Sequence, residues 1–270
     1  MKLAFLGGGN MAGALIGGLV ARGFDPRAIC VIEPSPVARE RLAARYPIHI
    51  ATAPDAAVQG SDTLVLAVKP QDMRVALASV ASGVSEKLVV SIAAGVKLEA
   101  LSRWLGGHRK LVRCMPNTPA LIGAGIAGLY ALPEVSPEER RKAETVLGAV
   151  GEIVWLDRED LLDPVTAISG SGPAYVFWFI EQLAYSAEQL GIPKDAALKL
   201  ALNTVLGAAK LAVSSDISPA ELRKQVTSKG GTTEAALKIF DEEKLAERFA
   251  RALQAASRRS AELGAELGKD

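Results

Sequence analysis

The sequence predicts an α/β protein in which a doubly wound parallel sheet is followed by an all-α domain. Along the first half of the chain, short β-branched apolar runs alternate with helical patterns. This rhythm is typical of βαβ units, because parallel strands need crossover connections. After Leu161 the strand signals stop and the apolar spacing becomes helical. These observations divide the chain into domains at residues 1–160 and 161–270.

Each element follows from its local pattern. Strands are expected where the runs are short and rich in Val, Ile and Leu, at 2–6, 29–32, 63–68, 88–91 and 110–115. Helices are expected between them, at 11–22, 37–44, 73–80 and 98–105. A helix at 138–150 and a strand at 152–156 complete the layer. Helices then follow at 174–190, 194–213, 218–226, 233–240 and 245–267. Ser218 and Glu221, on either side of Pro219, predict a capping box.

The first helix of the second domain is expected to be buried on every side. Its residues from Tyr175 to Ile180 are apolar in succession rather than along one stripe. The helical domain is too small to enclose this segment alone, so we expect a homo-oligomer whose subunits cover these helices together. Coverage by the sheet of the first domain is the alternative.

The composition argues against several classes of function. Lys and Arg number 31 against 30 Asp and Glu, and the resulting net charge of +1 leaves no basic field for nucleic-acid binding. Cys30 and Cys114 lie in apolar runs and predict buried thiols in a reducing compartment rather than a disulfide. His49 and His108 are widely spaced, so we expect no metal site.

We also expect a soluble, cytoplasmic protein with no membrane span. The N-terminal apolar stretch resembles a signal peptide only superficially, because Gly7 to Asn10 interrupt it where such a peptide must be continuous. No other window approaches the ~18 uncharged apolar residues of a membrane helix.

A glycine motif points to a dinucleotide. Gly7-x-Gly9-x-x-Ala12 directly follows the first strand and opens the first helix. Glycines here permit a tight turn and let backbone N–H groups reach a pyrophosphate, and the small Ala12 allows close helix–strand packing. This is the Rossmann fingerprint, although glycine-rich turns also serve packing alone. The ligand crevice is expected beyond the carboxyl ends of the strands.

The residues after the second strand leave the choice of dinucleotide open. Glu33 follows Ala12 by 21 residues, where an acidic side chain binds the ribose 2′-hydroxyl of NAD. Ser35 and Arg39 follow, and a hydroxyl with a guanidinium could instead hold the 2′-phosphate of NADP. Glu33 would repel that phosphate unless it turned away. Arg39 can also be read as an exposed helix residue.

Two further strand ends border the expected crevice. Ala67-Val68-Lys69-Pro70 ends one strand, and Ser91 to Gly95 end the next. Lys69 can face cofactor phosphates or ribose, or lie exposed in a loop. Asn117, in the stiff turn after the strand at 110–115, could bond the nicotinamide or only the turn.

The helical domain contains a candidate carboxylate site. Lys229-Gly230-Gly231-Thr232-Thr233 presents free N–H donors, a positive helix end and two hydroxyls together. Ordinary capping by a threonine is the alternative. From Glu159 to Pro193 there is no Lys, Arg or His, which argues against ketone reduction, since that chemistry needs an acid/base residue. A protonated cyclic imine is already an electrophile and needs orientation more than a strong acid.

Taken in order, the motifs resemble the pyrroline-5-carboxylate reductase family. They are Gly8-Gly9-Asn10-Met11-Ala12, Ala67-Val68-Lys69-Pro70, Ser91-Ile92-Ala93-Ala94-Gly95-Val96, Arg113-Cys114-Met115-Pro116-Asn117-Thr118-Pro119, Ser169-Gly170-Ser171-Gly172-Pro173-Ala174-Tyr175 and Gly230-Gly231-Thr232-Thr233. The resemblance implies an N-terminal Rossmann domain and a C-terminal helical dimerisation domain, in a dimer or a larger homo-oligomer. It also implies reduction of 1-pyrroline-5-carboxylate, a cyclic imine carboxylate, to L-proline with NADPH (NADP), or with NAD as the alternative, in the last step of proline biosynthesis.

The resemblance also assigns residues. It places the pyrophosphate loop at Gly8 to Ala12, through Gly9, Asn10 and Met11, next to Gly7 of the glycine motif, and a 2′-phosphate at Ser35 and Arg39. Ribose and nicotinamide contacts fall to Ala67, Val68, Lys69, Pro70, Ala93 and Asn117. Gly231, Thr232 and Thr233 would hold the substrate carboxylate, with Asp216 near the ring and Thr233 as the catalytic proton relay. Glu33 departs from the small or polar residue that this family often has there.

Two alternatives from other classes stay open. A hydroxyacid dehydrogenase of the phosphogluconate-like class shares the two-domain plan, but it needs a general-acid lysine at the start of the long helix, where this sequence has none. A non-catalytic dinucleotide-binding sensor is compatible with the cofactor loop, and the retained carboxylate motif argues against it.

Overall fold

The computed structural model describes residues 1–269, which group into two compact units. Unit 1 contains Met1–Ser171 together with the C-terminal residues from Gln254, and unit 2 contains Gly172–Leu253. The expected domains, 1–160 and 161–270, each consist of one continuous segment of the chain. The contacts instead group the end of the last helix with the sheet.

Within the described residues, unit 1 is built on one eight-stranded sheet of order β3-β2-β1-β4-β5-β6-β7-β8. The strands are β1 (Leu3–Leu6), β2 (Ile29–Ile32), β3 (His49–Ala51), β4 (Thr63–Leu66), β5 (Leu88–Ser91), β6 (Leu111–Met115), β7 (Gly125–Ala131) and β8 (Gly151–Trp155). Neighbouring strands pair in parallel except β6 with β7. The α/β fold class is confirmed, and the sheet is mixed rather than all parallel. The β6–β7 connection holds only a short 3₁₀ turn, too little for a crossover.

The predicted strands are present within two residues, but β3 and β7 were not predicted. β3 is a three-residue edge strand whose side chains are exposed or half-buried, so no apolar run marks it. β7 has the sequence Gly-Ile-Ala-Gly-Leu-Tyr-Ala. A Cβ on Gly128 would lie 2.8 Å from Val165, so packing excludes there the bulky residues by which strands are recognised.

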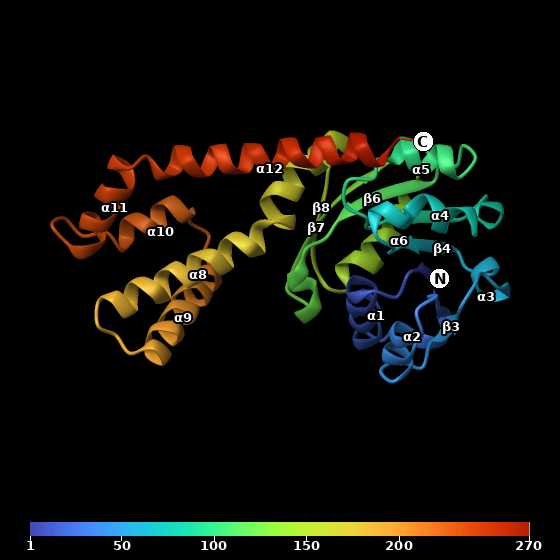
Figure 1. Cartoon of the computed structure of the whole chain (residues 1–270), viewed down its shortest axis with the longest axis horizontal. Helices are drawn as coiled ribbons and strands as arrows, with labels where there is room; N and C mark the ends of the chain where they lie inside the picture. The colour runs from blue at the N-terminus through green and yellow to red at the C-terminus, as the bar shows by residue number, and fades with distance from the viewer. Residues whose placement is uncertain (270) are drawn as a thin grey trace. The chain divides into compact units, whose positions relative to one another are not determined.

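Helices cover both faces of this sheet (Figure 1). One core lies under α1 (Asn10–Ala21), α2 (Pro36–Ala43) and α6 (Pro137–Gly148), and it includes Leu3 and Phe5 of β1. The other lies under α3 (Ala56–Gln59), α4 (Met73–Ala78) and α5 (Leu98–Trp104), and it includes Ala4 and Leu6. Alternate side chains of one strand therefore pack into opposite cores, as a sheet buried on both faces requires.

The C-terminal part of α12 (Leu245–Leu267) packs against the rest of unit 1. A Cβ on Gly264 would lie 2.9 Å from the carbonyl oxygen of Gly95, so these two backbones are in close contact. Ser260 donates a buried hydrogen bond of 2.7 Å to Oδ1 of Asp163, which lies on α7 (Leu162–Val165). These contacts explain why the chain from Gln254 onward groups with the sheet.

Unit 2 is helical. It contains α8 (Gly172–Gln189), α9 (Lys194–Val213), α10 (Pro219–Gln225), α11 (Thr232–Glu242) and the first part of α12, close to the expected bounds. Ser218 caps α10 by accepting from the N–H of Glu221 at 3.2 Å. The Glu221 carboxylate pairs with Lys224 Nζ at 3.1 Å, so the observed cap is a serine N-cap and not the predicted reciprocal box.

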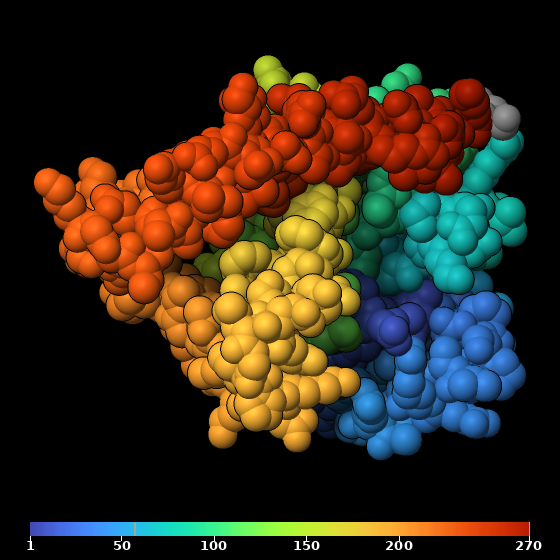
Figure 2. Space-filling view, turned by 60° about the vertical axis from the view of Figure 1, so that its left-hand side comes forward, coloured from blue at the N-terminus to red at the C-terminus, as the bar shows by residue number. Residues whose placement is uncertain are grey.

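The aromatic segment of α8 is exposed in the single chain. Phe177 and Trp178 are 65% and 59% exposed, and Figure 2 shows this helix, in yellow, at the surface. The neighbouring α9 is long and apolar enough to pass a length-and-composition test for a membrane helix, with a mean hydropathy of 1.4, although no such window was expected. Lys199 interrupts its apolar sequence, and a core helix covered by other protein passes the same test.

The side chains that could bind a metal ion are not clustered in the described residues. Cys30 and Cys114 are free and buried. Among residues 1–269, no three His, Cys, Asp or Glu side chains are placed to hold a metal ion together.

Candidate functional site

The loop between β1 and α1 contains glycines that serve different purposes. Gly7 adopts φ +100°, and a Cβ there would lie 2.7 Å from the carbonyl oxygen of Ala67. Gly9 is the N-cap of α1, and a Cβ there would meet no other atom of the described chain within 4 Å. The fold itself therefore requires Gly7, whereas the space beside Gly9 is open to a ligand that approaches the helix start.

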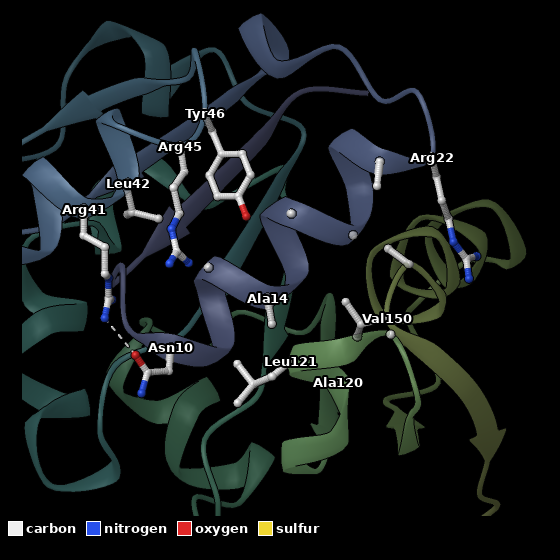
Figure 3. Close-up of a pocket in the computed structure, with 16 residues that line it drawn as sticks. Asn10, Ala14, Arg22, Arg41, Leu42, Arg45, Tyr46, Ala120, Leu121 and Val150 are labelled. Carbon is white, nitrogen blue, oxygen red and sulfur yellow. Dashed lines mark hydrogen bonds between the residues drawn. The ribbon is translucent and has the colours of Figure 1, made fainter.

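Gly8 is held from both sides. Its N–H donates to Oε2 of Glu33 at 2.7 Å, and its carbonyl oxygen accepts from NH2 of Arg41 at 3.0 Å. NH1 of Arg41 also donates to Oδ1 of Asn10 at 2.8 Å, as the dashed line in Figure 3 shows. Residues that follow β2 and lie on α2 thus fix the loop before any ligand binds, which is the preorganisation that a precise site needs.

The carboxylate of Glu33 joins the loop to the segment after β2. Its second oxygen, Oε1, accepts from the backbone N–H of Ser35 at 2.8 Å. The Glu33 side chain is largely buried, and it lies beside the open space at the helix start. Buried carboxylates need hydrogen-bond donors, and here two backbone amides supply them.

Ser35 and Arg39 already have partners within the protein. Ser35 is the N-cap of α2, and its Oγ accepts from the N–H of Ala38 at 3.5 Å. NH1 of Arg39 donates to the carbonyl oxygens of Glu33 at 3.0 Å and Pro34 at 2.7 Å. Both side chains lie close to Glu33, where the sequence placed them, and both also stabilise the turn into α2.

Part of the predicted set lines one cavity of about 690 Å³. It lies beyond the carboxyl ends of β1, β2 and β4, the edge at which a Rossmann sheet binds its ligand. The predicted residues in its lining are Gly7, Gly9, Ser35, Ala67, Val68 and Lys69. Its volume is in the usual range for cofactor clefts, and the open space beside Gly9 belongs to it, so these residues fit a dinucleotide.

The other predicted cofactor residues lie outside this lining. Ala12 is buried beneath α1 in the core, the packing role expected of it. Ala93 and Asn117 follow β5 and β6 at the same edge of the sheet, and both are buried. Oδ1 of Asn117 accepts from the N–H of Ile126 at 3.0 Å, so this side chain stabilises the turn and keeps its amide N–H groups for another acceptor. The remaining predicted residues are near lining residues in the sequence but do not line the cavity themselves: Gly8, Met11, Arg39 and Pro70.

A second cavity, of about 720 Å³, runs along the outer face of α1 (Figure 3). Its lining includes Arg22, Arg45 and Tyr46, and Asn10 is the predicted cofactor residue that it contains. Most of its lining comes from the length of α1 and from the end of α2, and none of it comes from the residues that directly follow β2, β4 or β5. We therefore assign the dinucleotide to the cavity beside Gly9, although the one along α1 is slightly larger.

Sequence reasoning missed part of the site. Thr52, Ala53 and Pro54 line the cavity because they follow β3, and that strand was not recognised. Asp72 and Val75, at the start of α4, also line it. Recognition of β3 would have placed its following loop at the same edge.

Gly170, just before α8, serves packing within unit 1. Thr166–Gly170 form a turn of π-helix, and a Cβ on Gly170 would overlap the side chain of Met115 at the end of β6. Gly170 therefore permits the approach of this segment to the strand that leads to Asn117. Turns of π-helix recur at functional sites. In this chain the turn brings Gly170 into contact with Met115.

The predicted substrate residues lie in unit 2. Gly231 is the N-cap of α11 and has no side chain to cap it, so the threonine-capping alternative is wrong; Oε2 of Glu234 accepts from the N–H of Gly230 at 2.6 Å. Thr232 and Thr233 form the first turn, where N–H groups lack partners within the helix. Thr233 is half-buried and Asp216, in the α9–α10 loop, is exposed. The helix start can accept an anion.

Comparisons with known proteins agree on one family. Residues 159–263 match the family model described as pyrroline-5-carboxylate reductase dimerisation, and residues 2–95 match the one described as NADP oxidoreductase, coenzyme F420-dependent. The pyrroline-5-carboxylate reductase of Pseudomonas aeruginosa is 46% identical over 269 residues, covering 99% of this chain and 98% of that protein.

Solved structures extend the agreement to the fold. A pyrroline-5-carboxylate reductase from Coxiella burnetii superposes with a TM-score of 0.93 at 40% identity, covering 97% of this chain and 98% of that one. The pyrroline carboxylate reductase of Plasmodium falciparum, solved with NADP bound, has a TM-score of 0.85 at 28% identity and covers 98% of both chains. With such identity over nearly its whole length, the chain belongs to the pyrroline-5-carboxylate reductase family.

Proposed function

We propose that this chain reduces 1-pyrroline-5-carboxylate to L-proline, the last step of proline biosynthesis, with a nicotinamide dinucleotide as reductant. The observation that carries the proposal is the 46% identity, over nearly the full length of both chains, to the pyrroline-5-carboxylate reductase of Pseudomonas aeruginosa. The open space beside Gly9, at the start of α1, is the feature of this chain that the proposal requires. Either NADPH or NADH meets the needs of the chemistry.

We assign the cofactor to residues of the first domain, 1–160. The helix start at Gly9, Asn10 and Met11 would hold the pyrophosphate through backbone N–H groups, without a basic surface. Ala67 to Pro70, Ala93 and Asn117 would surround the ribose and nicotinamide. When bound, the dinucleotide supplies the hydride that adds to the imine carbon. The imine nitrogen, protonated beforehand, becomes the secondary amine of proline.

We assign the substrate to the second domain, 161–270. The uncapped start of α11 at Gly231, Thr232 and Thr233 would bind the substrate carboxylate, where the positive end of the helix favours an anion. The Thr233 hydroxyl would donate to the imine nitrogen or relay its proton, and Asp216 would lie near the ring. A protonated imine needs no strong acid, and residues 159–193 supply no Lys, Arg or His. Catalysis is then mainly proximity and orientation.

We further propose a homodimer or a larger homo-oligomer. The exposed aromatic face of α8, with Phe177 and Trp178, supports it. Monomeric soluble proteins rarely expose large apolar side chains together, and such patches mark interaction surfaces. Phe177→Glu should dissociate the assembly in light scattering after size exclusion. Val37→Glu is the matched control, because Val37 is 75% exposed on α2 of the other unit. An unchanged mass for Phe177→Glu would refute this interface.

We also propose a cytoplasmic protein that binds neither nucleic acid nor membranes. The near-neutral net charge and two buried free cysteines support it.

The test of the reaction is spectrophotometric. Oxidation of NADPH and of NADH is followed in parallel after addition of 1-pyrroline-5-carboxylate, with proline measured as product. We expect turnover with at least one of the two. If neither is oxidised by the folded protein, the proposal is wrong, and binding of the dinucleotide without turnover would identify a sensor instead.

A further inference from the structure

The end of β2 carries a carboxylate at the position where dinucleotides differ. NADH and NADPH are distinguished by one group, a hydroxyl or a phosphate on the adenosine ribose. In this fold the ribose is bound by the residue at the end of the second strand. In this chain that residue is Glu33, which lines the cavity assigned to the dinucleotide.

The orientation of Glu33 is fixed by the protein. Oε2 accepts from Gly8 N–H at 2.7 Å and Oε1 accepts from Ser35 N–H at 2.8 Å. A rotation away from the cavity would leave both buried or half-buried bonds unmade, which is unfavourable. The sequence left open whether this side chain turns away, and its two backbone bonds hold it in place.

The same bonds decide what Glu33 can bind. A carboxylate has about four lone-pair positions, so each oxygen keeps one after accepting a backbone N–H. A ribose hydroxyl can donate to it, whereas a phosphate with its charge of about −1.5 to −2 cannot and is repelled. The Gly8 and Ser35 amides, which could otherwise serve a phosphate, are already committed to Glu33.

The charges that line the cavity do not offset this repulsion. The charged residues that line the cavity are Glu33, Lys69 and Asp72, two acidic and one basic. Arg39 adjoins Glu33 but is outside the lining, and its NH1 is bound to the carbonyl oxygens of Glu33 and Pro34. The Oγ of Ser35 accepts a hydrogen bond from the N–H of Ala38 at 3.5 Å. The lining of the cavity is therefore net acidic, and Arg39 is held at the main chain of the turn into α2 rather than in that lining.

We infer that Glu33 sets the cofactor specificity of this chain and favours the dinucleotide with a free 2′-hydroxyl, NADH, over NADPH. The inference rests on the proposed function, because it concerns the reductant of that same site.

Equilibrium binding tests it without reference to turnover. Dissociation constants for NADH and NADPH, and for the fragments ADP and adenosine 2′,5′-bisphosphate, are measured by calorimetry on the full chain. The wild type should bind NADH at least tenfold more tightly than NADPH. In Glu33→Ser the ratio of the two constants should shift toward NADPH at least tenfold, with the fragments following in the same direction.

The controls separate specificity from folding. Glu40→Ser removes an exposed carboxylate from the neighbouring helix α2 and should leave the ratio unchanged. Glu33→Gln keeps the length of the side chain without its charge, so a shift there as well identifies charge as the cause. Because the ratio compares two ligands on one protein, a general loosening of the loop does not imitate the effect, and melting temperatures verify folding.

Each outcome is decisive. Tighter NADPH binding by the wild type, or an unchanged ratio in Glu33→Ser, would overturn the inference while leaving the reductase proposal standing. Failure of the folded wild type to bind either dinucleotide would overturn the proposed function itself.

Discussion

Substitution of two glycines in the β1–α1 loop separates what the fold requires from what the ligand requires. Gly7→Ala places a side chain at φ +100°, with its Cβ 2.7 Å from the carbonyl oxygen of Ala67. The left-handed backbone costs roughly 1–2 kcal/mol and the overlap about 1–2 more. For a unit of this size each kcal/mol lowers the melting temperature by about 2–4 °C, so we expect a loss of roughly 4–16 °C.

Gly9→Ala should weaken dinucleotide binding and leave the melting temperature nearly unchanged. Gly9 has φ −66° and ψ −172°, an extended backbone that alanine adopts without strain, and its Cβ would meet no described atom within 4 Å. The melting temperature without ligand should therefore change by no more than about 2 °C, as for other surface substitutions. The methyl group would occupy the space beside the helix start, so dinucleotide affinity should fall at least about tenfold, or about 1.4 kcal/mol.

Two measurements check this pair. Thermal unfolding without ligand is compared with the dissociation constant for the better-bound dinucleotide, titrated by fluorescence. Wild-type affinity in Gly9→Ala would refute the assignment of the cavity to the cofactor. Equal loss of stability in both variants would show that the space beside Gly9 is not open in the folded protein.

Three further predictions follow from the structure. Thr233→Ala should lower kcat/KM at least about tenfold without a change in melting temperature, because the Thr233 side chain caps nothing in α11; unchanged kinetics would end its proposed role. Burial lowers the pKa of His108 below its ordinary 6.5, against the opposing hydrogen bond to the Lys87 carbonyl. The unfolded chain then binds the proton more readily, so stability is full above about pH 6.5 and declines as the pH falls below it. Urea unfolding between pH 7.5 and 5.5 should show a shallower decline in His108→Gln, and parallel declines would contradict the assignment. Burial raises the pKa of the Cys30 thiol to about 11 and that of Cys114 still further. Both cysteines should therefore resist a thiol reagent at pH 8 until the protein is unfolded, and rapid labelling of the native protein would disprove this.

Sequence patterns located the elements that have strong local signals. β2 is four buried apolar residues and α9 a long periodic helix, and both lie where their patterns placed them. β7 was missed because its packing demands small residues: a Cβ on Gly125 would lie 2.9 Å from Ala120, and one on Gly128 would meet Val165. Three residues of edge strand in β3 offer no pattern, and the cavity residues that follow it were missed for the same reason.

The candidate site divides along similar lines. The motif at Gly7, Gly9 and Ala12 could be read from the sequence, because a tight turn, a close approach and a small packing residue each demand a particular residue type. The role of Arg41 could not be read, since its partners Gly8 and Asn10 are more than thirty positions away. A surface arginine on a helix looks the same whether or not it clamps a loop.

The sequence by itself determined the two-domain order, the dinucleotide loop and the family, because periodicity and motif chemistry are properties of residues close together in the chain. Only the tertiary structure decided where the carboxylate of Glu33 points and which amides hold it. Its bond to Gly8 spans 25 positions, and the mixed sheet and the return of α12 to Gly95 are likewise contacts between distant segments. Such contacts depend on how folded elements meet in space, which no local pattern records.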